Sequence, residues 1–274
     1  MKILVVILLI LSAFQNISYA AFGDWQTGCR AKGMAGAYTG VAEGLDAIRW
    51  NPAGLAGLAG WQAQANLGSR TGIPGPANTT ASLGKNMGRW GGMALAIQLT
   101  GSEPEYDQSF VFAHGFGMTD QFSFGYDLNL YRRGTAYSAG VDVGLLARVH
   151  RIWRVGCFGH NFNHPSFGTE TPYELPSGIA VGLACQYLPR WTGSAEAGKE
   201  PGHTACYKIG TEWAVKQNVF NLRGGLSSQG RVTLYSLGTD ITASGLTVGY
   251  AYEGGHQELA GNHQLGLAYK WGAK

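Results

Sequence analysis

The chain has 274 residues, of which 14% are charged and 12% aromatic, and it contains 43 glycines. A charged fraction well below the roughly 25% of an ordinary soluble domain excludes a chain rich in solvated helix surface. The net charge of +3 is too small, and the basic residues are too scattered, to predict nucleic acid as a partner.

Residues 1–20 have the pattern of a secretory signal peptide. An apolar run over 3–13 is followed by Ser18-Tyr19-Ala20, whose small first and third residues suit signal peptidase. The alternative, an amphipathic first helix of the mature domain, is disfavoured because residues 4–11 are apolar on every side. We therefore expect an exported chain that begins near Ala21. No later apolar run reaches about 18 residues, so any membrane contact must come from strands.

The next segment, residues 21–60, is rich in glycine and alanine. It carries charged residues such as Arg30 and Glu43 without the alternation of a strand, so it does not form a lipid-facing wall. Irregular backbone is tolerated at membrane depth only inside protein or against water, which places this segment in a barrel lumen as a plug. Leu45–Trp50 is predicted as one helical turn that ends at Asn51-Pro52. We interpret Asn51 as a backbone-capping residue in preference to a ligand contact.

From Trp61 onward, segments of about 8 to 12 residues alternate apolar and polar positions between turn residues, which predicts antiparallel strands. In 121–131, for example, large apolar side chains alternate with polar residues that include Asp127 and Asn129. A soluble sandwich would alternate too, but polar faces rich in glycine, serine and threonine favour a barrel in lipid. Six tryptophans at strand ends are expected to form aromatic girdles at the two membrane interfaces: Trp61, Trp90, Trp153, Trp191, Trp213 and Trp271.

Thirteen strands can be read directly, but a single-chain bacterial barrel normally has an even number. The thirteen are 61–70, 79–86, 90–99, 107–117, 121–131, 136–149, 152–162, 177–187, 204–214, 219–227, 231–241, 246–254 and 262–272. A fourteenth fits at Arg190–Gly198, which follows a turn at Pro189 and also alternates. The predicted fold is therefore an all-β, transmembrane antiparallel barrel of about 14 strands with an N-terminal lumenal plug.

One hairpin tests the predicted register. In 207–213 and 220–226 the apolar faces leave Glu212 and Arg223 pointing inward, opposite or diagonal to each other across the turn. We interpret this lumen ion pair as a structural clasp in preference to a catalytic pair.

The last strand, His263–Trp271, carries an assembly pattern. Gly266, Tyr269 and Trp271 have the glycine-x-x-aromatic-x-aromatic spacing of terminal strands that the outer-membrane assembly machinery recognises. The alternative is an ordinary final strand. Three residues, 272–274, extend past the usual terminal aromatic.

The segment Gly28–Ala56 resembles the N-terminal signature of PorV/PorQ-like outer-membrane proteins, which are relatives of FadL-type barrels. The likeness continues at 176–182, 210–213, 222–225 and 248–252. The residues that carry the plug motif are Gly28, Arg30, Gly33, Gly36, Asn51, Pro52 and Gly54. Departures are Cys29 in place of a small residue, Ala35 in place of glycine, and Glu43-Gly44 in place of two acids. The resemblance implies a 14-stranded barrel with an N-terminal hatch.

These observations divide the chain into a signal peptide (1–20), a plug (21–60) and a barrel (61–274). Catalytic chemistry is not indicated. The spacing of His160 and His164 could chelate a metal only on a helix, but the two residues lie at a strand end that runs into a loop. No serine lies in a G-x-S-x-G motif. The four cysteines show no C-x-x-C spacing and are interpreted as structural: Cys29, Cys157, Cys185 and Cys206. We expect no enzyme activity, no metal and no cofactor.

Two functions of different class remain. The closer PorV/PorQ resemblance favours a protein-secretion or surface-assembly component of the bacterial outer membrane. The alternative is a FadL-like transporter of hydrophobic small molecules. Because the predicted lumen face is small and polar, the first is preferred. The expected partners are outer-membrane lipid, the barrel assembly machinery, and secretion-system proteins or exported cargo.

Overall fold

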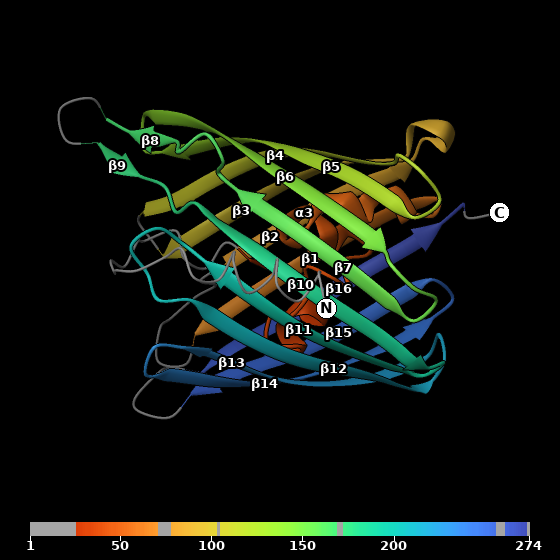
Figure 1. Ribbon diagram of the computed structural model, residues 1–274. Coiled ribbons are helices and arrows are strands. Elements are labelled where there is room, and N and C mark those ends of the chain that lie inside the picture. Colours follow the sequence, from red (N-terminus) through yellow and green to blue (C-terminus); the bar gives the residue numbers. More distant parts are fainter. Residues whose placement is uncertain (1–25, 71–77, 103–104, 169–171, 256–260, 273–274) are drawn as a thin grey trace.

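Fourteen strands close into one antiparallel barrel in the computed structural model, which describes residues 26–70, 78–102, 105–168, 172–255 and 261–272 (Figure 1). The strands follow one another around the wall in chain order, and β1 (Trp61–Arg70) pairs with β16 (Asn262–Trp271) to close it. The predicted barrel of 14 strands is confirmed. The predicted signal peptide lies outside the described residues.

The fourteenth strand, predicted from parity at Arg190–Gly198, is β11 (Trp191–Lys199). The other wall strands are β2 (Asn78–Asn86), β3 (Gly92–Ser102), β4 (Glu105–Gly117), β5 (Phe122–Arg133), β6 (Ala136–Arg148), β7 (Trp153–His160), β10 (Gly178–Leu188), β12 (Cys206–Lys216), β13 (Phe220–Gln229), β14 (Val232–Ala243) and β15 (Leu246–Gly255). A two-stranded sheet, β8 (Ser166–Phe167) with β9 (Tyr173–Glu174), lies in the connection between β7 and β10 and was not predicted.

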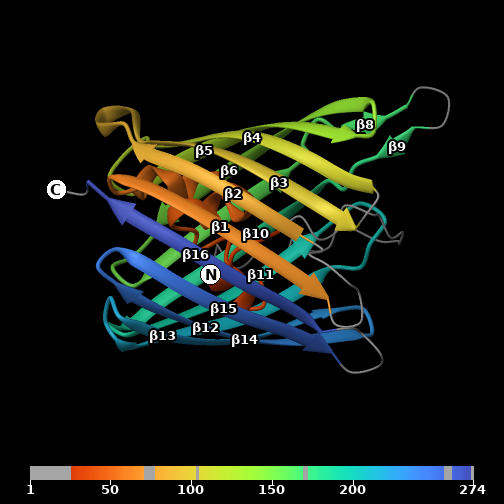
Figure 2. The same cartoon turned by 180° about the vertical axis from the view of Figure 1, so that it is seen from behind.

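The two ends of the barrel differ. β1 begins and β16 ends at the same end, where Trp61 pairs with Trp271 (Figure 2). The strands turn tightly there, as at Pro189-Arg190 and Ser244-Gly245. We call it the short-turn end. The opposite, long-loop end carries the longest connection, 161–177. Short turns at one end and longer loops at the other are typical of outer-membrane barrels.

The wall has an apolar exterior and a polar interior because its side chains alternate. On β5, Leu128 and Leu130 are 49% and 45% exposed, whereas Asp127 and Asn129 between them are buried toward the lumen. The same alternation recurs around the wall and leaves a belt of leucine, isoleucine, valine and aromatic side chains outside. Such a belt stabilises a barrel in lipid.

The prediction that the six tryptophans mark both membrane interfaces is wrong. All six lie at the short-turn end: three open β1, β7 and β11, two pair with these in register on β12 and β16, and Trp90 lies in the short helix η3 (Gly88–Trp90). Exposed tyrosines, including Tyr137, Tyr207 and Tyr235, lie near the other end. The direction of the strands explains why all of them lie at one end. Each of the five tryptophans in strands lies near the start of a strand that runs away from the short-turn end or near the finish of one that runs toward it, and Trp90 directly precedes such a start.

Residues 26–60, here called the plug, lie inside the barrel (Figure 1). The plug contains α2 (Cys29–Gly33), η1 (Gly44–Asp46), α3 (Ala47–Trp50) and η2 (Pro52–Gly57). The helical turn predicted at 45–50 corresponds to η1 and α3, whereas α2 was not predicted. No helix in the described part of the chain is long and apolar enough to cross a membrane.

Candidate functional site

The plug is seated on inward-facing glycines of the wall. Gly92, Gly115, Gly125 and Gly144 are successive register partners across β3, β4, β5 and β6. A Cβ added at any of them would overlap η2 or Asn51 just before it. Because glycine has no Cβ, the backbone of η2 can lie directly against the strands.

Further glycine pairs continue this seat around the barrel. Gly156 and Gly182 pair across β7 and β10, and a Cβ on Gly182 would lie 2.6 Å from the Gly40 nitrogen. Gly210 and Gly225 likewise pair on β12 and β13 against Met34, and Gly249 and Gly266 on β15 and β16 against Cys29. We call these ten wall residues the glycine belt. The belt leaves little space between plug and wall, and core packing of this density resists displacement.

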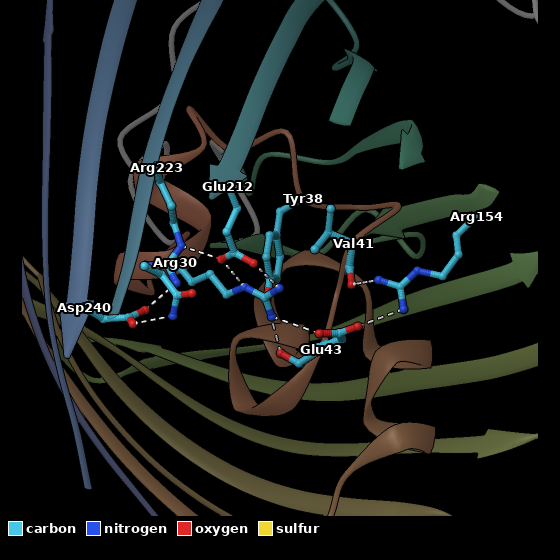
Figure 3. Close-up of polar contacts among 9 residues, drawn as sticks. Arg30, Tyr38, Val41, Glu43, Arg154, Glu212, Arg223 and Asp240 are labelled. Atoms are coloured by element: carbon cyan, nitrogen blue, oxygen red, sulfur yellow. Dashed lines mark hydrogen bonds and ion pairs between the residues drawn. The ribbon is translucent and has the colours of Figure 1, made fainter. Parts of the chain in front are cut away.

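An ion cluster joins α2 to the wall (Figure 3). Arg30 donates from Nε to Oε2 and from Nη2 to Oε1 of Glu212, both at 2.8 Å. The structure places Glu212 directly opposite Arg223, whose Nε donates to the same carboxylate at 2.6 Å. Arg223 also pairs with Asp240. The Glu212–Arg223 pair was predicted from the sequence. The contact of Arg30 with this pair was not predicted, because no periodicity relates the plug to the strands, and Asp240 was not predicted either.

Glu43 extends this cluster across the lumen. It accepts from Arg30 Nη1 and from Arg154 Nη1, each at 2.9 Å, and Arg154 also donates to the carbonyl of Val41 (Figure 3). Partial burial opposes ionisation of Glu43, but the two arginines outweigh it and lower the pKa of the carboxyl below its usual range. Its side chain is 49% exposed, so this bridge contributes less than the Glu212 contacts.

A buried wall carboxylate holds the centre of the plug. Glu196 on β11 accepts hydrogen bonds from the backbone amides of Tyr38 at 3.0 Å and Thr39 at 2.9 Å. Lys208 Nζ neutralises it at 2.9 Å. Charge-assisted bonds of this kind are among the stronger ones in proteins. Sequence reasoning could place Glu196 in the lumen but not identify backbone amides as its partners.

Asn51 and Arg49 fix the other half of the plug. Asn51 Nδ2 donates to the carbonyls of Thr39 at 3.0 Å and Leu145 at 2.9 Å, while its Oδ1 accepts from Ala53 N at 3.2 Å. These bonds agree with the capping interpretation. Arg49 Nη1 donates to Asn129 Oδ1 at 3.0 Å and so joins α3 to β5.

The other predicted motif residues serve packing and turns. Gly28 and Gly36 have positive φ values of 108° and 71°. Gly33 lies against Gly238 of β14, and Gly54 lies against the Ala42 carbonyl. Pro52 opens η2 at its first turn, where the missing N–H costs nothing. In the terminal strand, Tyr269 and Trp271 face outward and stack at 5.5 Å, so only Gly266 of that motif touches the plug.

A cavity of about 20 Å³ lies beside the plug, between η1, α3 and the first strands. Both polar and apolar side chains line it, among them Asp46, Gln64, Leu45 and Ile48. That volume holds about one water molecule. Within the described ranges, no group of three or more His, Cys, Asp or Glu side chains is arranged to hold a metal. His160 ends β7, and His164 contacts Ser177 Oγ at 3.0 Å, so the two do not form a site.

The wall is incomplete beside β6. β7 pairs only with residues 143–148 of β6, so in the described part of the chain no strand pairs with 136–142 on that side. The side chain of Asn163 takes the place of a strand: it accepts from Val141 N at 2.9 Å and donates to the Ala139 carbonyl at 2.8 Å. We call this stretch the seam. Val141 and Ala139 pair with Leu128 and Leu130, so the seam is level with the apolar belt.

Apolar side chains flank both faces of the seam. Inside, Tyr131, Phe167 and Leu175 form a buried cluster separate from the plug core. Outside, Tyr137 and Phe162 are 58% and 70% exposed. Phe162, Phe167 and Leu175 of this connection therefore cover a stretch of β6 that has no partner strand.

No protein-family model matches the chain, and no curated protein matches it in sequence. Solved structures do match. The Ralstonia pickettii toluene transporter TbuX has a TM-score of 0.69 at 12% identity, covering 92% of this chain and 100% of its own. A Pseudomonas aeruginosa FadL homologue has a TM-score of 0.67 at 11% identity, covering 90% and 98%. The Pseudomonas putida toluene transporter TodX has a TM-score of 0.65 at 13% identity, covering 93% and 98%. The chain thus has the fold of the FadL-type outer-membrane barrels.

Proposed function

We propose that this protein is an outer-membrane channel for small hydrophobic molecules, and that solute leaves the barrel sideways through the seam. The observation that carries the proposal is the seam itself. It combines a stretch of β6 that has no partner strand, an apolar inner cluster, and a seal by Asn163 and the Phe162 amide at the level of the apolar belt. An opening there would let an apolar solute pass into lipid without crossing the polar lumen.

The plug supports a lateral route. Its backbone contacts the glycine belt, Arg30 is bonded to Glu212, and the amides of Tyr38 and Thr39 are bonded to Glu196. An axial route would break these contacts and would carry an apolar solute past buried polar groups. Leaving such groups without partners costs about 1–3 kcal/mol each. A lateral route leaves the plug in place.

The fold neighbours support the same class of solute. TbuX and TodX are described as toluene transporters, and a TodX variant as a monoaromatic hydrocarbon channel. At 11–14% identity this likeness concerns the fold, so the solute class is part of the proposal. None of these structures is described as PorV/PorQ-like. The preference for protein secretion therefore gains no support, and the transporter alternative is the better supported of the two.

Uptake of an apolar solute tests the proposal. Cells that lack their own uptake route should take up radiolabelled toluene faster when they produce the chain, with uptake of a polar sugar unchanged. The variant Asn163→Ala removes the seal on Val141 N and the Ala139 carbonyl and should raise toluene uptake further. The matched control Gln217→Ala alters an exposed amide at the other end of the barrel and should leave uptake unchanged. Equal toluene uptake with and without the chain would refute the proposal.

A further inference from the structure

The tryptophans at the short-turn end form a belt with defined packing. Trp61 stacks on Trp271 at 6.0 Å, and Trp191 stacks on Trp213 at 5.6 Å. Trp90 is the most exposed, at 58%. Indole rings favour the headgroup level of a bilayer, where an apolar body and a polar N–H both find partners. The belt therefore marks the level of one leaflet's headgroups.

Basic residues accompany this belt. A basic residue directly precedes the tryptophan in Arg89-Trp90, Arg190-Trp191 and Lys270-Trp271, and Arg151 comes two residues before Trp153. Lys85 Nζ lies 4.7 Å from the ring centre of Trp61, and the Arg89 guanidinium lies 5.0 Å from that of Trp90. We call the following five residues the basic rim: Lys85, Arg89, Arg151, Arg190 and Lys216.

The charge of the basic rim is uncompensated. In the described part of the chain, the turns at this end contain one acid, Asp120, and none of the five basic residues has an ion-pair partner. The long-loop end differs. Acidic and basic residues are mixed there, and Arg133 pairs with Asp107 at 2.7 Å. Among the described residues, uncompensated positive charge therefore gathers at the short-turn end.

We propose that the basic rim binds anionic phospholipid headgroups in the leaflet at the short-turn end. The indole rings set the depth of the contact, and the neighbouring cations lie at the level of the phosphates. A phosphatidylglycerol-type headgroup has a net negative charge that these cations can neutralise, whereas a zwitterionic headgroup already neutralises its own phosphate. Attraction of Lys and Arg to an anionic surface falls off within about a Debye length, so only the rim takes part.

The tryptophan belt also provides the readout. The full chain is reconstituted in two kinds of vesicle: phosphatidylcholine mixed with brominated phosphatidylglycerol, and brominated phosphatidylcholine mixed with phosphatidylglycerol. Because bromine quenches tryptophan fluorescence, the extent of quenching reports which lipid lies against the tryptophan belt. We expect phosphatidylglycerol to be preferred by about fivefold, the factor that one charge contributes near an anionic surface. Adding about 0.5 M NaCl should reduce the preference, because it shortens the Debye length.

Two variants separate the rim from general charge. Arg89→Gln/Arg151→Gln/Arg190→Gln should bring the preference close to one. The control Arg132→Gln/Arg231→Gln removes exposed cations of the long-loop end and should keep it. Equal quenching by the two lipids in the unmodified chain, or a preference that resists both salt and the rim variant, would overturn the proposal. Since the salt arm uses the unmodified chain, the test stands even if a variant does not assemble.

Discussion

Glu212 joins the plug to the wall because its carboxylate accepts hydrogen bonds from an arginine of each. Arg30 binds it in a bidentate arrangement, which fixes both distance and orientation. Arg223 on the neighbouring strand binds the same carboxylate and is itself neutralised by Asp240. Two acids and two bases thus balance inside a narrow lumen, where an unpaired charge would be costly.

Removing this carboxylate should loosen the plug. In Glu212→Gln, Arg30 and Arg223 would lose the carboxylate that lies between them and keep only Glu43 and Asp240 as acidic partners. Breaking a buried ion pair typically costs about 3–5 kcal/mol. Hydrogen exchange of the α2 amides should become faster. The control Glu43→Gln affects a carboxylate that is half exposed, and should cost at most about 1 kcal/mol. Equal protection of α2 in Glu212→Gln and in the unmodified chain would contradict this role.

Asp46 should make plug stability depend on pH. Burial raises the pKa of its carboxyl above the ordinary value of 3.8, although Gln64 donates to it. A group with a raised folded-state pKa stabilises fully below its ordinary pKa, and this contribution is lost as the pH rises through the folded-state value. The variant Asp46→Asn, which keeps an acceptor for Gln64, should therefore exceed the unmodified chain in plug stability at neutral pH.

Urea titrations of plug release between pH 3.5 and pH 7.5 measure this difference. The two proteins should approach each other at the acid end of the range, where Asp46 is protonated in the folded state and mostly protonated in the unfolded state. A difference in plug stability that stays constant, or grows toward acid pH, would show that burial does not raise the pKa of Asp46.

At the scale of the elements, contact between the plug and the wall accounts for the ten glycines of the glycine belt. Four strands offer a continuous row of register partners from Gly92 to Gly144, and η2 lies across it. Overpacking such a contact by one methyl group typically costs about 1–3 kcal/mol.

A matched pair of glycines tests the belt. Gly156→Ala on β7 would place a Cβ in the carbonyl oxygen of Thr39, whereas a Cβ at Gly193 on β11 meets nothing within 4 Å. Both barrels should fold, as shown by heat-modifiable migration on gels. Added protease should then cut residues 26–60 readily in Gly156→Ala and slowly in Gly193→Ala. Similar cleavage of the two variants would show that the belt does not hold the plug.

The wall could be predicted from sequence because alternation is local and strand number obeys parity. Even β11, which was not among the thirteen strands read directly, was predicted from these two rules. The position of the plug in the lumen could be predicted from the sequence, but its local structure could not. Its helices are too short for periodicity to appear, and its positions depend on wall contacts such as Glu196 with the amides of Tyr38 and Thr39. The β8–β9 sheet, with strands of two residues, carries no detectable alternation either.

The candidate site was predictable only in part. Register brought Glu212 and Arg223 together, but the seam depends on where β7 stops pairing with β6, and strand lengths are not readable to that accuracy. The glycine belt left a signal that was not used: inward-facing glycines fall opposite one another in the predicted register. Aligning glycines across neighbouring strands would have located the seat of the plug.

At the scale of the whole molecule, the proposed function assigns closure and passage to different parts of the barrel. The plug closes the axis of the barrel, the seam provides a lateral route at the level of the apolar belt, and the basic rim faces the leaflet at the other end. The central claim is that solute passes while the plug stays in place. It can be tested because the plug contains Cys29, and Gly266 on the wall lies close enough to be replaced by a second cysteine.

A disulfide between plug and wall tests this claim most directly. A Cβ at Gly266 lies 3.6 Å from the Cβ of Cys29, within the range of disulfides, so Gly266→Cys should lock α2 to β16 on oxidation. Toluene uptake is measured for the oxidised variant and for the same variant after reduction, which serves as its control. We expect equal uptake by the oxidised and the reduced protein, because the proposed lateral route leaves the plug in place. Loss of uptake on oxidation, with recovery on reduction, would show that solute passes through the plug and would contradict it.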